Sequence, residues 1–363
     1  MSGQAPLDFH VVSEQDATGP RQPIRRVAMA MVRKGVGMSN LVFPQFVGCG
    51  RSGTTLLRNM FDSHSALAMT HESHFIGPLA KVRSRYESEA GFDCDVFVAD
   101  LFSDAKFVRQ GLELEAVRSA LEKARPETYA AAVRAVFAAY AAREGKTLYG
   151  DKTPGSVTQI ELLAELFPEA KFVHIIRDGR AVALSFLERP EWGPKTMAEA
   201  ASYWKNRLRR GRAAGWVIGP ERYMEIRYED LVTDPEAAAR QVCGFLGLDF
   251  EDGMLRYHEK SKEFIASTKD PAAFKNLSRP VTAGLRTWED EISSGDQRLF
   301  EAIAGDLLKE LGYPVSGASP DIATRIRAII AATLYQWKRI VAFLSARLKR
   351  SIRLVEDIKE EVG

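Results

Sequence analysis

The chain has 363 residues, 45% of them apolar, which is enough for one large hydrophobic core with or without appendages. A formal net charge of +2 gives no general electrostatic reason to expect a nucleic-acid partner. Three widely spaced cysteines, and no Cys/His cluster with metal-ligand spacing, predict neither a disulfide framework nor a metal site and favour a reducing compartment.

Residues 1–40 are predicted to be a weakly ordered N-terminal extension. Residues 1–23 are polar, and residues 24–36 are short, basic and too broken for the apolar part of a secretory signal. No stretch reaches the ~18 uninterrupted apolar residues of a membrane-spanning helix. We therefore predict a cytoplasmic location, with membrane association at most peripheral.

The first predicted unit of regular structure surrounds a glycine-rich turn. The apolar run 41–47 reads as a strand, Gly48–Thr55 (GCGRSGTT) as the turn, and the residues from 56 to 61 as a helix. Unpaired N–H groups and the helix dipole make such a turn an anion site. Its spacing is that of a P-loop, but Thr54 stands where the lysine would be and Arg51 precedes it. This favours an anion other than a nucleoside triphosphate with Mg²⁺.

The segment Arg51-Ser52-Gly53-Thr54-Thr55 resembles a loop of the sulfotransferases that use 3′-phosphoadenosine 5′-phosphosulfate (PAPS). In that family the R-S-G-T-T loop holds the 5′-phosphosulfate, and the resemblance implies the same role here. The simpler alternative is a glycine turn before a helix, without a ligand.

A second motif follows a region, 75–145, that reads as largely helical and includes the alanine-rich run 130–140. Residues 160–167 read as a helix, 171–176 as a strand and 181–187 as the next helix. The segment 167–181 resembles the 3′-phosphate segment of the same family, particularly its tyrosylprotein sulfotransferase-like branch. The resemblance implies that Arg177, Ser185 and Arg189 contact the nucleotide. An ion pair of Arg177 with Asp178 or with a carboxylate on a helix is the alternative.

Two further residues match catalytic positions of that branch. Glu72 follows Arg51 by 21 residues, the spacing of the branch's general base, and a carboxylate can act as a base if burial raises its pKa. His71 and His74 are rivals for this role. Lys152 matches the lysine that contacts the bridging oxygen and the sulfuryl group; a solvated lysine beside Asp151 is the alternative.

The rest of the catalytic region is less specific. Residues 224–228 read as a strand, and Tyr228 resembles the family's tyrosine near the adenine, although simple strand packing would also explain it. A helix is predicted from 234 to 245. Residues 278–288 resemble the family's loop before a tryptophan, but their alignment supports no individual contact.

The predicted fold is α/β: a P-loop-like parallel sheet flanked by helices, in the manner of the sulfotransferase fold, with a long C-terminal helix. The resemblance covers roughly residues 41–312. We therefore predict a sulfotransferase domain at 41–314, followed by a linker and a basic amphipathic helix at 315–363.

The C-terminal helix carries an apolar stripe from Ile322 to Val355, with eight basic and no acidic residues from Arg325 to Arg353. It could lie on an anionic membrane, pack on the core, or form a homodimer through residues 321–360. The pattern alone favours packing on the core or on a partner subunit.

These observations predict an enzyme that transfers a sulfuryl group from PAPS, without a metal, to a hydroxyl by direct in-line displacement. The acceptor stays open among carbohydrates, lipids, small molecules and tyrosyl groups, since the secretory targeting of the tyrosylprotein branch is missing here. The alternatives are a P-loop nucleotide kinase, which Thr54 disfavours, and an inactive membrane-surface or scaffold protein with this fold.

Overall fold

The computed structural model describes residues 42–267, 271–281, 287–317 and 320–331, and from 333 to 345 the residues 333–335, 337–338, 340–341 and 344–345. The chain separates into two compact units, residues 1–41 and 42–363. The predicted N-terminal extension lies outside the described residues. The helical stretch that begins at residue 322 belongs to the second unit.

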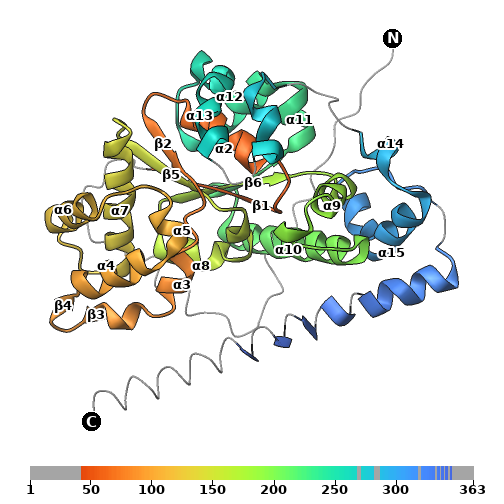
Figure 1. Ribbon diagram of the computed structural model, residues 1–363, viewed down its shortest axis with the longest axis horizontal. Helices are drawn as coiled ribbons and strands as arrows, with labels where there is room; N and C mark the ends of the chain where they lie inside the picture. The colour runs from red at the N-terminus through yellow and green to blue at the C-terminus, as the bar shows by residue number, and fades with distance from the viewer. Residues whose placement is uncertain are drawn as a thin grey trace, which may run out of the picture. The chain divides into compact units, whose positions relative to one another are not determined.

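A parallel sheet lies at the centre of the second unit (Figure 1). Its order is β2-β5-β1-β6-β7, with the bounds β1 Phe43–Gly48, β2 Leu67–Thr70, β5 Leu148–Lys152, β6 Ala170–Ile176 and β7 Tyr223–Arg227. Every residue of the central strand β1 is buried, as expected for a strand covered on both faces. The predicted parallel sheet flanked by helices is confirmed.

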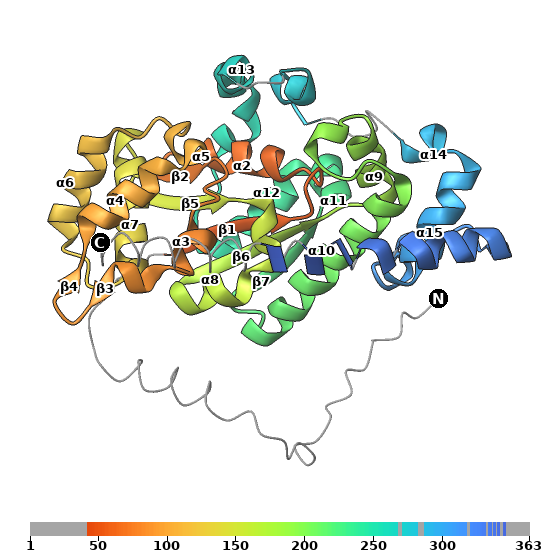
Figure 2. The same ribbon diagram turned by 60° about the horizontal axis from the view of Figure 1, so that its bottom comes forward.

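Helices cover the two faces of the sheet in separate groups. On one face, α2 (Thr54–Asp62) and α12 (Pro235–Leu246) pack with Phe46, Val173 and Ile226 of the strands. On the other face, α8 (Ile160–Leu166) and the 22-residue α10 (Met197–Ile218) lie below the sheet (Figures 1 and 2). Each group therefore buries one face of the strands.

The region 75–145 is mostly helical, as predicted, and packs against β2 and β5 through α7. It also contains a two-stranded hairpin that the sequence reading missed. The elements are α3 (Ile76–Ala80), β3 (Glu87–Ser88), β4 (Gly91–Phe92), α4 (Cys94–Ser103), α5 (Ala105–Val108), α6 (Leu114–Ala124) and α7 (Tyr129–Arg143).

The remaining helices are α9 (Gly179–Leu187), α11 (Tyr228–Thr233), α13 (Tyr257–Ser267), α14 (Trp288–Glu291) and α15 (Ser294–Glu310). Of these, α11 and α13 pack with α12 and α2, whereas α9 and α15 pack with α10. Tyr228 opens α11, so the prediction that it belongs to the preceding strand is wrong. Glu229 and Asp230 in the first turn favour a helix start, because carboxylates there complement the helix dipole.

A buried arginine fixes the chain directly after β6. Arg180 is fully buried and pairs with Asp178 (Nη2–Oδ2 2.7 Å) and Glu301 (Nη1–Oε1 3.1 Å). Its guanidinium lies 3.6 Å from the ring centroid of Trp288. Asp178 also accepts a hydrogen bond from the Arg180 N–H and so caps α9. This network holds the loop between β6 and α9 in one conformation.

We expect Arg180→Ala to lower the free energy of unfolding by about 3–5 kcal/mol, because it leaves two carboxylates of the network without their buried cation. Urea unfolding would measure the loss. The matched control is Arg240→Ala, which removes an exposed partner of Glu236 and should cost less than about 1 kcal/mol. Equal losses in the two variants would contradict a structural role for the buried network.

Candidate active site

The glycine-rich turn follows β1 and leads directly into α2. Arg51 and Gly53 have positive φ angles of 70° and 89°, so the turn uses the left-handed region twice. At Gly48, a Cβ would lie 2.7 Å from the carbonyl oxygen of Ile175 on β6. The absence of a side chain at Gly48 therefore lets the end of β1 approach β6 closely.

The start of α2 presents hydrogen-bond donors. Its N-cap is Gly53, no side chain caps it, and its first turn has no acidic residue. The Ser52 hydroxyl is buried and has no hydrogen-bond partner within the described part of the chain. Thr54 is also buried, and Thr55 is partly buried. An uncapped helix start beside an unsatisfied hydroxyl is suited to an anion.

The loop after β6 lies against this turn. Arg177 donates from Nη1 to the carbonyl oxygen of Arg51 at 3.1 Å, and Arg51 donates from Nε to Ser185 Oγ at 2.8 Å. The Arg177 guanidinium lies 4.3 Å from the ring centroid of Tyr228. Asp178 forms its ion pair with Arg180 and not with Arg177, which was the alternative. The structure thus brings the two predicted loops together.

Trp192 is a neighbour that the sequence reading missed. Its ring lies 5.0 Å from the Arg51 guanidinium and 5.7 Å from that of Arg189, measured to the ring centroid. Cation–π contacts of this kind can hold arginines close to each other. In the sequence, the only indication of this contact is that an aromatic residue follows Arg189 by three positions.

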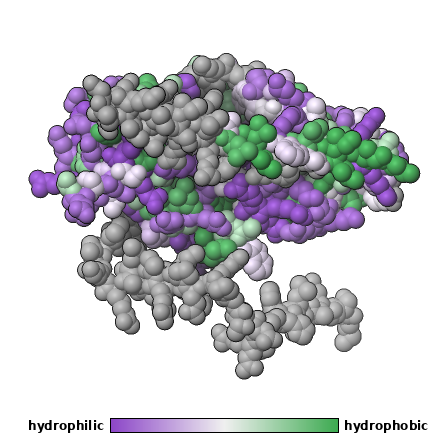
Figure 3. All heavy atoms as spheres, turned by 90° about the horizontal axis from the view of Figure 1, so that it is seen from below, coloured by the Kyte–Doolittle hydropathy of each residue, from purple (hydrophilic) through white to green (hydrophobic). Residues whose placement is uncertain are grey.

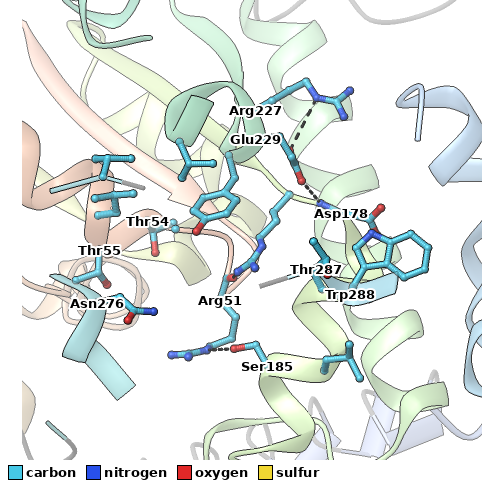
Figure 4. Close-up of a pocket in the computed structure, with 18 of the residues that line it drawn as sticks. Arg51, Thr54, Thr55, Asp178, Ser185, Arg227, Glu229, Asn276, Thr287 and Trp288 are labelled. Carbon is cyan, nitrogen blue, oxygen red and sulfur yellow. Dashed lines mark hydrogen bonds and ion pairs between the residues drawn. The ribbon is translucent and has the colours of Figure 1, made fainter. Parts of the chain in front are cut away.

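A cavity of about 1230 Å³ opens between the two loops (Figure 4). In Figure 4, Arg51 reaches Ser185. Thr54 and Thr55 lie on one side of the cavity, and Thr287 and Trp288 lie on the other side. Eight of the predicted nucleotide-binding residues line it: Arg51, Gly53, Thr54, Thr55, Arg177, Ser185, Arg189 and Tyr228. Asn276, Ser278 and Arg279 contribute to its wall, while residues 282–286 of the predicted 278–288 loop lie outside the described residues.

Glu72 and Lys152 form a second cluster and are not among the residues that line this cavity. Lys152 ends β5, and Glu72 lies two residues after β2, the strand beside β5. Lys152 Nζ is 3.0 Å from Glu72 Oε1, and His74 Nε2 is 2.8 Å from Glu72 Oε2. The Lys152 side chain is 4% exposed and that of Glu72 is 39% exposed, so Lys152 is not a solvated surface lysine.

A buried carboxyl group positions the segment that carries Glu72. Asp151 Oδ1 accepts hydrogen bonds from Thr70 Oγ1 at 2.9 Å and from the Ser73 N–H at 3.3 Å. Burial raises the pKa of Asp151, and these hydrogen bonds oppose the rise. Glu72 lies between the two anchored residues, so its place beside Lys152 is fixed from both sides.

The charges around Glu72 decide the direction in which its pKa shifts. Burial acts to raise the pKa of Glu72, but the Lys152 ammonium and hydrogen bonds from His74 and Lys152 outweigh it and hold the pKa below its ordinary value. The condition that burial should raise the pKa of Glu72 toward neutrality is therefore not met in the protein alone. Burial, with the charges of Arg58 and Lys152, lowers the pKa of His71 to about 2, so His71 is neutral.

Residues 46–252 match the model of the sulfotransferase family, which is more than half of the chain. The chain belongs to the sulfotransferase family. It is accordingly a sulfuryl-transferring enzyme.

Curated relatives include two kinds of sulfotransferase. Protein-tyrosine sulfotransferase A of Caenorhabditis elegans is 23% identical over 76% of this chain and 68% of its own length. The protein-tyrosine sulfotransferase of Drosophila melanogaster is 25% identical over 76% of this chain but only 52% of its own length, so the match spans about half of that relative. An omega-hydroxy-beta-dihydromenaquinone-9 sulfotransferase of Mycobacterium bovis is 32% identical over 39% of this chain and 37% of its own.

Solved structures that resemble this sulfotransferase include the sulfotransferase domain of the Synechococcus olefin synthase, with 22% identity and a TM-score of 0.47 over 77% of this chain and 98% of that one. A mouse sulfotransferase complexed with PAP has 12% identity and a TM-score of 0.39 over 76% and 88%.

The predicted cytoplasmic location is contradicted by these relatives, because protein-tyrosine sulfotransferases belong to the secretory branch that the motifs resemble. The prediction rested on cysteine usage and on the reading of residues 1–36 as lacking a secretory signal. Cysteine usage does not decide the compartment, because a protein with a large core can be stable without disulfides. Within the described residues, no helix has the length and apolar character needed to cross a bilayer.

We expect Gly53→Ala to destabilise the protein more than Gly145→Ala. Both glycines have positive φ angles, 89° and 67°, so alanine costs each about 1–2 kcal/mol in backbone strain. At Gly53 a Cβ would also lie 2.3 Å from Tyr228 Cδ2, whereas at Gly145 no atom lies within 4 Å. Urea unfolding should give an additional loss of about 1–3 kcal/mol at Gly53. Identical losses would mean that the Tyr228 ring moves aside without cost.

Proposed function

We propose that this sulfotransferase transfers the sulfuryl group of PAPS to a hydroxyl group of its acceptor. The observation that carries the proposal is the direct contact of two anion-binding loops, through Arg177 Nη1 and the Arg51 carbonyl oxygen. PAPS has two phosphate-bearing ends, and two adjacent cationic loops suit one ligand of this kind.

The residues present fit this donor. The uncapped start of α2 and the unpartnered Ser52 hydroxyl supply donors for a 5′-phosphosulfate, together with Arg51, Thr54 and Thr55. Arg177, with Ser185 and Arg189, would hold the 3′-phosphate, for which planar guanidinium groups are suited. When bound, PAPS supplies the sulfuryl group and a nucleotide leaving group.

Glu72 would take the proton of the acceptor hydroxyl on a carboxylate oxygen. Its lowered pKa keeps it ionised at neutral pH, which a base requires, but also makes it a weak base. An anion beside Lys152 would share the charge of the ammonium and weaken its hold on Glu72. The pKa of Glu72 would then rise toward the range in which a base is effective.

Lys152 would stabilise negative charge that develops on the leaving group. A buried ammonium with a fixed partner is already desolvated and oriented, so it needs little reorganisation. His74 donates to the second oxygen of Glu72 when its Nε2 carries a proton, and would keep that carboxylate turned toward Lys152.

The acceptor is proposed only as a class. The relatives' names give a protein tyrosine and an omega-hydroxyl of a menaquinone, and both are hydroxyl groups. A PAPS-dependent assay with tyrosine peptides, hydroxylated isoprenoids, sugars and phenols would identify the acceptor.

We expect adenosine 3′,5′-bisphosphate to bind the purified protein, as measured by calorimetry. Arg177→Ala should weaken this binding by about 1.5–3 kcal/mol, roughly 10- to 150-fold, since it removes a charge-assisted contact. Arg240→Ala, which removes a distant exposed arginine, should leave the affinity unchanged. The proposal fails if the unsubstituted protein does not bind at millimolar ligand.

Glu72→Gln should lower kcat with the identified acceptor by about 10²–10⁴-fold, because the amide keeps the shape of the side chain but cannot accept the proton. The affinity for adenosine 3′,5′-bisphosphate should stay nearly constant, which separates loss of the base from loss of the site. Normal turnover of Glu72→Gln would move the role of base to a histidine.

The pH dependence of kcat/KM gives a second measurement on the same role. With PAPS as the varied substrate, kcat/KM reports the enzyme before the donor binds. In that form the pKa of Glu72 is lowered, so the carboxylate stays ionised as the pH falls through the range of histidine titration. We expect no loss of kcat/KM between about pH 7.5 and 5.5. A base with an ordinary imidazole pKa of about 6.5 would instead lose activity in this interval.

A further inference from the structure

The C-terminal helical residues expose a set of large apolar side chains to solvent. We call them the apolar face; each is between 50 and 76% exposed: Ile322, Ile326, Ile329, Ile330, Leu334, Trp337, Ile340, Val341 and Leu344. Figure 3 shows hydrophobic side chains gathered at the right, where Figure 1 places the stretch that begins at residue 322. These side chains do not pack on the core, which was one of the two arrangements that the sequence pattern favoured; packing on a partner subunit stays a prediction.

The apolar face occupies one side of a helix. At roughly 100° per residue, its members fall within an arc of about 140°, and Trp337 lies close to the middle. Arg325 flanks one edge of this arc, while Arg327 and Lys338 flank the other. An apolar stripe with basic edges and a central tryptophan is the pattern of helices that lie in a membrane interface.

The opposite side of the helix contacts the rest of the protein through small residues and one ion pair. Ala328 is 6% exposed and, with Ala331, packs against the cluster formed by α9, α10 and α15. Lys338 Nζ also lies 2.5 Å from Glu199 Oε1 on α10. The helix is therefore held with its apolar face outward.

The charge of the segment distinguishes between possible occupants of the apolar face. Between Asp321 and Glu356 the chain has eight basic residues and no acidic residue. Two copies placed face to face would bring like charges together, whereas an anionic lipid surface attracts them. We propose that the apolar face docks this protein on an anionic lipid bilayer.

Vesicle sedimentation of the full chain tests the proposal. Phosphatidylcholine vesicles that contain phosphatidylglycerol should pellet the protein, and phosphatidylcholine alone should pellet much less. Substituting Ile326→Glu and Ile330→Glu together should lower the partition coefficient at least about tenfold, since both side chains would enter the interface. Arg325→Gln and Arg327→Gln should each lower it about fivefold at low salt.

The matched control is Trp216→Glu with Val217→Glu, two apolar side chains at the end of α10 that are 86 and 76% exposed. This control should pellet like the unsubstituted protein, and the cooperative melting transition of every variant should stay unchanged. Absence of the unsubstituted protein from the phosphatidylglycerol pellet would overturn the proposal, as would an equal loss in the control. A concentration-dependent dimer that Ile326→Glu with Ile330→Glu dissolves, without vesicle binding, would instead identify a second copy as the occupant.

Discussion

The pairing of β1 with β6 is the constraint on which the candidate active site depends. The two strands run parallel over six residue pairs, from Phe43 beside Ala170 to Gly48 beside Ile175. Because parallel strands end at the same edge of a sheet, their following loops must meet there. A side chain at Gly48 would separate the strands at this point, since its Cβ would approach the Ile175 carbonyl oxygen. The contact between Arg177 and Arg51 follows from this register.

Three of the arginines that line the cavity lie close to aromatic rings. Tyr228 supplies a ring face for Arg177, and Trp192 lies near both Arg51 and Arg189. The ring faces interact favourably with guanidinium without neutralising it. Contact with an aromatic ring therefore leaves the charge of a guanidinium available to an anionic ligand. Arg180 has the opposite environment: it is buried between two carboxylates and serves the fold.

The Glu72–Lys152 pair gives the proposed catalytic step a built-in dependence on the donor. In the protein alone the two charges stabilise each other, which keeps Glu72 ionised but weakly basic. An additional anion near Lys152 would change this balance. The base and the cation would then gain their catalytic properties together, when the donor is present.

Local sequence determined the elements that short-range rules specify. The glycine-rich turn, the β-branched strand at 171–176 and the alanine-rich helix α7 could be read from their residues because turn chemistry and periodicity act over a few positions. The order of the two loops and their resemblance to one family also identified Arg51, Arg177 and Ser185 before any contact was known. The start of α11 at Tyr228 was missed because strand propensity and a helix N-terminus compete at that residue.

Only the tertiary structure decided the contacts between residues far apart in the chain. Glu72 and Lys152 meet because β2 pairs with β5, and no pattern in the sequence indicates that pairing. The hydrogen bonds from Thr70 and Ser73 to the buried carboxyl group of Asp151 depend on the same pairing and could not be predicted either. The direction of the Glu72 pKa shift depends on these contacts, so residue type alone could not determine it. The sequence likewise determined the amphipathic pattern of the C-terminal helix. The tertiary structure decided which side of this helix faces the protein. The alanines, and not the isoleucines, fit the surface of α10 and α15, because side-chain packing depends on the shape of both partners.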